Sequence, residues 1–200
     1  MKNVLALKTS IRASGSNSSR LVDQMIQAWV DHNPGDNIST RDLTQSDIPH
    51  LGEAAYASMP LTNDQRSAEQ EALMALSDQL TQEFLAADVI LIGMPMYNFH
   101  VPSAFKAYID HIARPGLTFR YTETGPVGLA GDKQVIFLLA RGGIYWDTPN
   151  DTQTPYLKAM FNFMGISNLR FIVAEGLNIS PAMCEAGLQS ATQQIDSFFS

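Results

Sequence analysis

Cysteine is almost absent from this sequence, since Cys184 is the only one in 200 residues. A single thiol can form neither an internal disulfide nor a thiolate metal cluster, which excludes a disulfide scaffold and a cysteine-ligated metal centre. Such scarcity fits a reducing compartment. Cys184 lies on an apolar helical stripe, where we interpret it as a small buried hydrophobic residue.

Long apolar runs and an excess of positive charge are also lacking. No segment approaches the roughly 18 apolar residues that indicate a membrane span. The apolar residues before Lys8 are too few for the core of a signal peptide. Lys and Arg total 13 against 20 Asp and Glu, a formal charge of −7, which disfavours nucleic acid and anionic membranes as partners. We therefore expect a soluble cytoplasmic protein.

Short apolar runs alternate with amphipathic segments along the whole chain, without a repeat or a dividing linker. The runs predict strands at Asn3–Leu7, Asn37–Asp42, Val89–Gly93, Gln134–Ala140 and Leu169–Glu175. This alternation is typical of βαβ units. We predict one domain over residues 1–200 with a flavodoxin-like, doubly wound α/β fold. Its five-stranded parallel sheet would have the order 2-1-3-4-5, with helices on both faces.

Five helical stripes connect and follow these strands. Their apolar residues recur at three- and four-residue spacing, starting at Leu21, Leu73, Phe105, Leu157 and Cys184. Thr62 and Gln65 have the spacing of a capping box, which would open the second helix. Pro102 suits the first turn of the third helix.

The loop after the first strand is rich in hydroxyl groups and runs into a helix N-terminus. In a doubly wound sheet, ligands bind outside the carboxyl ends of the strands, and free N–H groups at a helix N-terminus stabilise an anion. Ser10, Ser16, Asn17 and Ser18 add further donors. Because G-x-G-x-x-G and G-x-x-x-x-G-K-[ST] are absent, a monophosphate such as that of FMN is the better ligand. Helix capping and solvation of a turn would also explain these serines.

The loop after the third strand has the side chains that suit an isoalloxazine ring. Pro95 ends the strand, and Met96, Tyr97, Asn98 and Phe99 follow it. A flavin needs an apolar wall and a few fixed donors at its polar edge. Met96 and Phe99 are candidates for the wall and Asn98 for a donor. An aromatic-rich turn packed under a loop is the alternative.

The loop after the fourth strand contains Ala140, Arg141, Gly142 and Gly143. Adjacent glycines let a backbone approach a ligand closely, so their N–H groups are candidates for the pyrimidine edge of a flavin. An ordinary Gly-Gly turn explains them equally well.

Other polar and glycine residues receive structural interpretations. Gly125, Gly128 and Gly131 do not follow a strand and are interpreted as loop glycines; Glu123, Asp147 and Asp151 are interpreted as solvated loop carboxylates. The sequence contains no H-E-x-x-H motif and no carboxylate cluster typical of a metal site, so we predict no metal. Nor is a protein nucleophile expected.

Taken together, these motifs resemble the bacterial FMN-dependent NADH:quinone oxidoreductases, also called FMN-dependent NADH-azoreductases. The resemblance covers essentially the whole chain and rests on Val4–Ser10, Ser16–Ser18, Pro95–Phe99, Thr118–Glu123, Arg141–Gly143 and Ala174–Gly176. The runs P-M-Y-N-F and F-R-Y-T-E are the most specific. The chain departs from the family at Ala140, where serine is usual, and at Leu51–Leu61, which should cover the pocket.

The resemblance implies a homodimer with non-covalent FMN in two sites at the subunit interface. Ser10 and Ser16–Ser18 would hold the phosphate and ribityl chain, Met96–Phe99 would line the flavin, and Ala140–Gly143 would contact its polar edge. Tyr121 and Phe163 would border the substrate pocket. NADH, or NADPH, would donate hydride to flavin N5 and leave before a quinone, azo or nitro aromatic compound accepts two electrons.

Two other functions share this fold. A flavodoxin-type one-electron carrier would also bind FMN, but it favours a strongly acidic docking face, whereas the charge here is spread along the chain. A flavin-free regulatory domain would leave Met96–Phe99 and Arg141–Gly143 unexplained.

Overall fold

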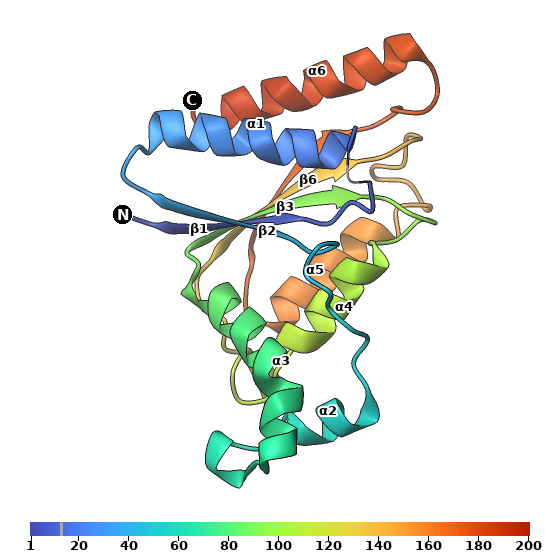
Figure 1. Cartoon of the computed structure of the whole chain (residues 1–200). Coiled ribbons are helices and arrows are strands. Elements are labelled where there is room, and N and C mark those ends of the chain that lie inside the picture. Colours follow the sequence, from blue (N-terminus) through green and yellow to red (C-terminus); the bar gives the residue numbers. More distant parts are fainter. Residues whose placement is uncertain (13) are drawn as a thin grey trace.

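A five-stranded parallel sheet forms the centre of the computed structural model, which describes residues 1–12 and 14–200 (Figure 1). Its strands are β1 (Asn3–Lys8), β2 (Asn37–Asp42), β3 (Val89–Pro95), β6 (Gln134–Ala140) and β7 (Asn168–Ala174). Their order is β2-β1-β3-β6-β7, which confirms the predicted topology. All of β3 is buried, as its continuous apolar sequence requires for a strand covered on both faces.

Helices cover both faces of this sheet. On one face, α1 (Asn17–His32) lies beside α6 (Pro181–Phe198), and the other face carries α3 (Ala68–Ala86), α4 (Ser103–Ile112) and α5 (Gln153–Phe163) (Figure 1). Each face has its own apolar cluster, the larger one under α3, α4 and α5. In the described part of the chain, no helix is both long and apolar enough to cross a membrane.

The segment before α3 differs from the prediction. The capping box of Thr62 and Gln65 is present, but it opens a short 3-10 helix, η1 (Asn63–Gln65). Helix α3 begins after a second capping box, formed by Ser67 and Gln70. An additional short helix, α2 (Glu53–Ser58), precedes both, and its single turn and a half is too short to give a periodic apolar pattern.

The predicted apolar stripe of α3 is confirmed at Leu80 and Phe84, which are buried, but it is wrong at its first position. Leu73 is 42% exposed whereas Met74 is buried. The buried face includes Ser77 and Thr81 because both hydroxyls donate to the backbone oxygen of His111, at 2.6 and 3.4 Å. The periodicity of apolar residues does not predict that serine and threonine are buried on the same face of a helix.

A two-stranded antiparallel hairpin, β4 (Phe119–Thr122) and β5 (Gly125–Gly128), was not predicted. Gly125 and Gly128 are therefore strand residues, which corrects their interpretation as loop glycines. Gly128 packs against the turn after α5 so closely that a Cβ would lie 2.0 Å from the backbone nitrogen of Gly165. Four-residue strands with Gly and Pro give too short a pattern for sequence-based recognition.

Candidate functional site

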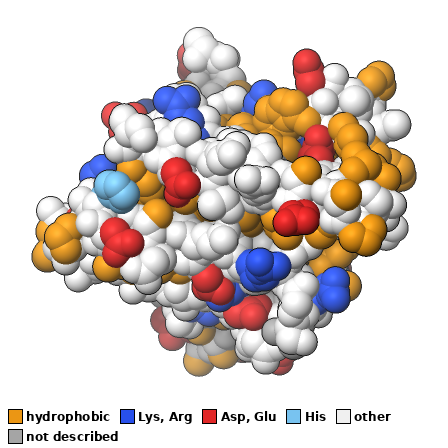
Figure 2. All heavy atoms as spheres, turned by 90° about the horizontal axis from the view of Figure 1, so that it is seen from above, with side chains coloured by type: hydrophobic (Ala, Val, Ile, Leu, Met, Phe, Trp, Pro, Cys, Tyr) orange, Lys and Arg blue, Asp and Glu red, His pale blue; other side chains and the backbone are white. Residues whose placement is uncertain are grey.

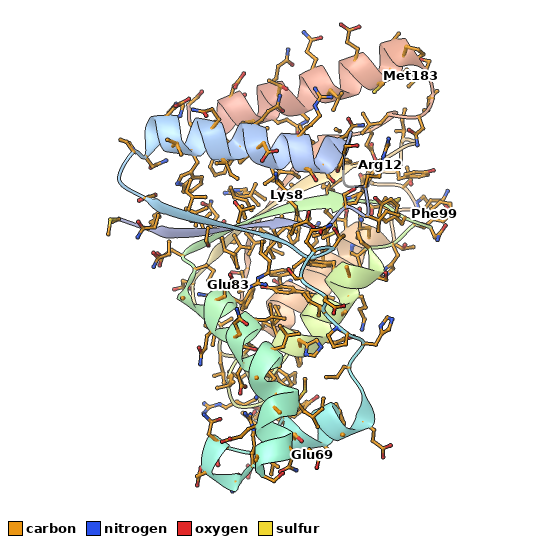
Figure 3. The ribbon with its side chains drawn as sticks, in the orientation of Figure 1. Lys8, Arg12, Glu69, Glu83, Phe99 and Met183 are labelled. Carbon is orange, nitrogen blue, oxygen red and sulfur yellow. The ribbon has the colours of Figure 1, made fainter. Side chains whose placement is uncertain are left out.

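The loops that follow β1, β3 and β6 meet at one end of the molecule, because these neighbouring strands are parallel. In Figure 3, Arg12 of the first loop and Phe99 of the second lie at this end. Apolar side chains gather on the same side in Figure 2. The loops at this end of the sheet carry four exposed apolar residues, Phe99, Ile144, Trp146 and Ile179.

The start of α1 has several features that favour the binding of an anion. Ser16 caps the helix, with its Oγ accepting from the backbone N–H of Ser19 at 3.2 Å, and it lies 3.2 Å from Ser18 Oγ. Among residues 1–12 and 14–200, the N–H groups of Asn17 and Ser18 have no acceptor. The first turn contains no acidic residue, and Arg12 Nη2 lies 3.6 Å from the position of a Cβ on Gly15. The helix dipole, the N–H groups at the start of α1 and the guanidinium of Arg12 therefore favour a negative charge at this position.

Ser10 joins this loop to the one after β3. Its hydroxyl lies 3.1 Å from the Tyr97 hydroxyl and accepts from the backbone N–H of Arg12 at 3.2 Å. Next to it, Thr9 Oγ1 donates to the carbonyl of Gly93 at 2.7 Å. Both contacts fix the anion-binding loop relative to the loop that would carry a planar ligand.

The loop after β3 contains a tight turn. Tyr97 and His100 exchange backbone hydrogen bonds of 3.0 and 2.9 Å, and the central residues Asn98 and Phe99 have φ of 49° and 64°. This is the two-residue turn that requires positive φ at both central positions. Asn tolerates this backbone but Phe rarely adopts it, so Phe99 is held in a strained position at the tip, where half of it is exposed. Such strain concentrates at ligand sites.

A hollow of about 480 Å³ opens between the loops after β3 and β6. The lining residues are Met96, Asn98, Phe99, Gly142, Gly143, Tyr145 and Asn178. Phe99 and Tyr145 meet edge to face at 5.6 Å between ring centroids, so the walls are flat and partly apolar. Two larger hollows lie beside α6. One of about 610 Å³ touches the loop after β6 through Ile144 and Trp146 but lies against the edge strand β7, and one of about 600 Å³ lies between α1 and α6. Neither is at the switch point between β1 and β3, where this fold binds ligands.

Sequence reasoning missed Tyr145 and Asn178 as lining residues. Asn178 donates its backbone N–H to Gly142 O at 2.9 Å, and a Cβ on Gly142 would lie 2.6 Å from Asn178 Nδ2. Asn178 follows the fifth strand, whereas the sequence predicted a ligand site only at the loops after the first, third and fourth strands. In the described residues, the N–H groups of Gly142 and Gly143 have no internal acceptor. They are available to a ligand.

Ala140 and Arg141 lie behind the hollow instead of lining it. The Ala140 carbonyl accepts from Met96 N–H at 3.1 Å, and Arg141 N–H donates to Ala174 O at 2.9 Å. The Arg141 side chain is fully buried. Its guanidinium binds both carboxylate oxygens of Asp151, at 3.0 and 3.1 Å. Contact of the Arg141 guanidinium with a flavin edge therefore has no support in this geometry.

Asp151 corrects another interpretation, because this carboxylate is buried and not a solvated loop residue. Burial alone raises its pKa, but hydrogen bonds from Thr154 and Arg141 outweigh burial and hold the pKa below its ordinary value. Asp151 is thus ionised at neutral pH and neutralises Arg141.

The Arg141 network connects both ligand loops. Arg141 Nε donates to Gln153 Oε1 at 3.3 Å, and Gln153 Nε2 donates to Pro95 O at 2.9 Å. On the other side, Glu175 Oε1 accepts from Arg141 Nη1 at 3.3 Å and from the backbone N–H groups of Tyr145 and Trp146, both at 2.8 Å. One buried network therefore fixes the relative positions of the two walls.

Tyr121 and Phe163 lie away from this hollow in the same chain. Phe163 ends α5, just before β7, and its ring contacts that of Phe119 in a tilted arrangement, at 4.4 Å between centroids. Tyr121 contacts Phe119 at 5.5 Å and is 74% exposed. They lie near the amino ends of the strands, and a seven-residue strand such as β6 spans about 23 Å at 3.3 Å per residue. One chain does not bring them to the hollow.

An anion-binding helix N-terminus next to a flat-walled hollow, at the switch point of a doubly wound sheet, defines a flavodoxin-type mononucleotide-binding protein. The family model described as flavodoxin-like fold matches residues 2–199. An FMN-dependent NADH:quinone oxidoreductase of Cellvibrio japonicus is 46% identical over 179 residues, 90% of each chain. Another, of Burkholderia lata, is 45% identical over 195 residues, 98% of each chain.

Solved structures agree with these relatives. An azoreductase from Bacillus anthracis superposes with a TM-score of 0.87 at 31% identity, covering 98% of this chain and 100% of the other. An FMN-dependent NADH-azoreductase of the same species, in complex with FMN, has a TM-score of 0.87 at 26% identity, covering 100% and 98%. The chain belongs to the flavodoxin-like FMN-dependent NADH:quinone oxidoreductase family.

Proposed function

We propose that this protein is an enzyme that binds FMN without a covalent link and uses NADH to reduce quinones and azo compounds by two electrons. The observation that carries the proposal is the junction of the anion-binding start of α1 with the flat-walled hollow, through the contact of Ser10 with Tyr97. The names of the relatives support it. When bound, FMN supplies hydride acceptance at N5 and release of two electrons.

The residues of the site fit FMN part by part. Ser10 and Ser16–Ser18, with Arg12 nearby, would hold the phosphate and the ribityl chain. Met96, Tyr97 and Phe99 would line the ring, and Asn98 would donate to its polar edge. The N–H groups of Gly142 and Gly143 are free to bind the pyrimidine edge, while Ala140 and Arg141 position this loop from behind.

The same pocket serves both substrates in turn. The nicotinamide stacks against the open side of the hollow, and the oxidised nucleotide leaves before the acceptor enters. Quinones and azo compounds are planar, and aromatic side chains favour their stacking. Reduction of an azo bond to two amines requires four electrons, so the pocket receives NADH twice for each molecule.

A homodimer completes this pocket. Tyr121, Val127 and Leu117 are exposed apolar residues near the hairpin, and one chain cannot bring Tyr121 or Phe163 to its own hollow. In the proposed dimer, these two residues reach the hollow of the partner and border its substrate. Each site then contains the ligand loops of one subunit and the aromatic cluster of the other.

Co-expression of two variants tests this arrangement. The Ser16→Asp chain is expected to lose FMN, and the Tyr121→Ala chain to lose quinone turnover, so each homodimer is inactive or slow. Their heterodimer, isolated with two different affinity tags, has one intact site and should recover about half of the normal activity per dimer. Activity no higher than that of the two homodimers would contradict sites shared between subunits.

The Ser16→Asp substitution also tests the phosphate position directly. Asp is as good an N-cap as Ser, so α1 is retained, but juxtaposed like charges cost several kcal/mol. FMN affinity should fall more than 100-fold in a titration followed by flavin fluorescence. The matched control is Ser67→Asp, which makes the same change at the N-cap of α3. Equal loss in both variants would place the phosphate elsewhere.

Steady-state assays test the activity itself. NADH oxidation by the purified protein should require both FMN and an acceptor such as benzoquinone, and an azo dye should lose its colour under the same conditions. Failure of NADH and NADPH to support turnover in the FMN-loaded protein would overturn the proposed function.

A further inference from the structure

Another cavity, of about 420 Å³, lies between η1, α3 and the segment that follows α4 and is partly open to solvent. It is separate from the flavin hollow of the same chain, because α4 leads away from the loop after β3 for ten residues, about 15 Å of helix. Two arginines, Arg66 and Arg114, line it together with a single carboxylate, Asp78.

Both arginine side chains are almost completely buried, with 3% and 2% of their surface exposed. Arg66 Nη1 donates to Asp78 Oδ2 at 2.6 Å. Arg114 Nη1 donates to Asp78 Oδ1 and to Ser77 Oγ, both at 2.8 Å. Although burial raises the pKa of Asp78, the hydrogen bonds from Arg66 and Arg114 outweigh it and hold the pKa below its ordinary value. Asp78 is therefore ionised, and one of the two positive charges is left without a counterion.

Many hydrogen-bond donors at this position are also unused. Within residues 1–12 and 14–200, the buried Nε atoms of Arg66 and Arg114 have no acceptor, and neither Nη2 donates to any group. Arginine has five N–H donors and no acceptor. Buried donors and charges are normally satisfied by the protein, water or an ion, so this pair has capacity for an additional acceptor.

The rest of the cavity is largely apolar. Met59, Leu61, Leu85 and Leu117 contribute to its wall, and Thr62 and Asn63 are the polar residues from the η1 segment. An inorganic ion would leave this apolar surface without a contact, whereas a neutral apolar molecule would leave the charge unpaired. Only a ligand that has both a negative charge and an apolar body matches the cavity.

We propose that this cavity binds a small organic monoanion, with its carboxylate on Arg66 and Arg114 and its apolar body against Met59 and the leucines. A carboxylate matches the planar donor fork of a guanidinium and supplies the one missing negative charge. The proposal is independent of FMN and of the oxidoreductase activity.

Benzoate is a suitable probe, and benzyl alcohol is its neutral counterpart. In the FMN-loaded protein with ¹³C-labelled methionine methyl groups, benzoate should shift the Met59 signal and leave that of Met96, in the flavin hollow, unchanged. Benzyl alcohol should shift Met59 much less. The Arg66→Gln variant should weaken benzoate binding about tenfold, as expected for hydrogen bonds to a charged group.

Three controls keep the result interpretable. Arg66→Lys preserves the charge but removes the planar donor fork, and its affinity should lie between those of Arg66→Gln and the wild type. Arg170→Gln removes an exposed arginine outside the cavity and should have no effect. The Tm of each variant reports whether it is folded. A Met59 shift that is equal for benzoate and benzyl alcohol, a shift of Met96 alone, or unchanged affinity in folded Arg66→Gln would overturn the proposal. None of these results depends on turnover.

Discussion

Asp151→Asn is expected to destabilise the protein by about 3 kcal/mol, because it breaks a buried ion pair and leaves the Arg141 charge with only the single, longer contact to Glu175, at 3.3 Å. Asp151 binds the fully buried Arg141 through both carboxylate oxygens. Arg141 also connects to Pro95 through Gln153. FMN affinity should therefore fall as well, although Asp151 does not line the hollow. Urea unfolding and a flavin titration measure the two effects.

Asp147→Asn is the matched control for this variant. Asp147 is an exposed aspartate in the same loop, with a φ of 58° that asparagine tolerates well. The same change of charge should therefore alter the free energy of unfolding by less than about 0.5 kcal/mol. If both variants lost the same stability, the effect would come from the loop's net charge and not from the buried pair.

The dependence of stability on pH gives a further test of the Asp151→Asn variant. The pKa of Asp151 is held below its ordinary value of 3.8 in the folded state, so its contribution is present above that value and is lost as the pH falls toward the folded pKa. The wild type should therefore lose stability below pH 3.8 as Asp151 becomes protonated. Asp151→Asn has no carboxylate at this position and should lose less stability over the same pH range. Parallel acid-unfolding curves for the variant and the wild type would contradict the pKa shift.

Gly128→Ala is the second substitution with a large expected effect. A Cβ at this position would lie 2.0 Å from Gly165 N and 2.2 Å from Met164 C, both backbone atoms. Because backbone cannot rotate away, the β4–β5 hairpin must move from the end of α5. We expect a loss of about 2 to 3 kcal/mol, typical of overpacking, and slower quinone reduction, since the hairpin positions Tyr121. FMN affinity should change little.

The control is Gly52→Ala. Gly52 has no atom within 4 Å of its Cβ position and no positive φ, so alanine is accommodated there. Thermal unfolding, FMN titration and quinone kinetics compare the two variants. A Gly128→Ala protein with normal Tm and normal KM for benzoquinone would show that the contact with Gly165 does not position the hairpin.

The sheet could be predicted because each of its central strands is an uninterrupted apolar run. β3 and β6 are almost entirely buried, and such runs are visible in sequence. The hairpin and α2 could not be predicted, because their patterns are too short for a periodic signal. In α3, the buried positions of Leu80 and Phe84 could be predicted, but those of Ser77 and Thr81 could not, because these hydroxyls are buried through tertiary hydrogen bonds to His111.

The loops of the candidate site could also be placed from the sequence, since they follow from strand order alone. The roles of individual side chains could not. Because Arg141 precedes two glycines, the sequence predicted it as a ligand residue. Its partners, Asp151 and Glu175, are distant in sequence, and their contacts with Arg141 are known only from the folded structure. The left-handed backbone of Phe99 is likewise a property of the turn, not of its residue type.

The central claim is that NADH reduces FMN in this site and that a quinone reoxidises it by two electrons. Anaerobic stopped-flow mixing tests it most directly: the FMN-loaded protein is mixed with NADH, and benzoquinone is then added. The account predicts rapid loss of the absorbance of oxidised flavin, followed by full recovery without a one-electron form. No loss with NADH or NADPH would contradict it and favour a one-electron carrier or a flavin-binding regulator.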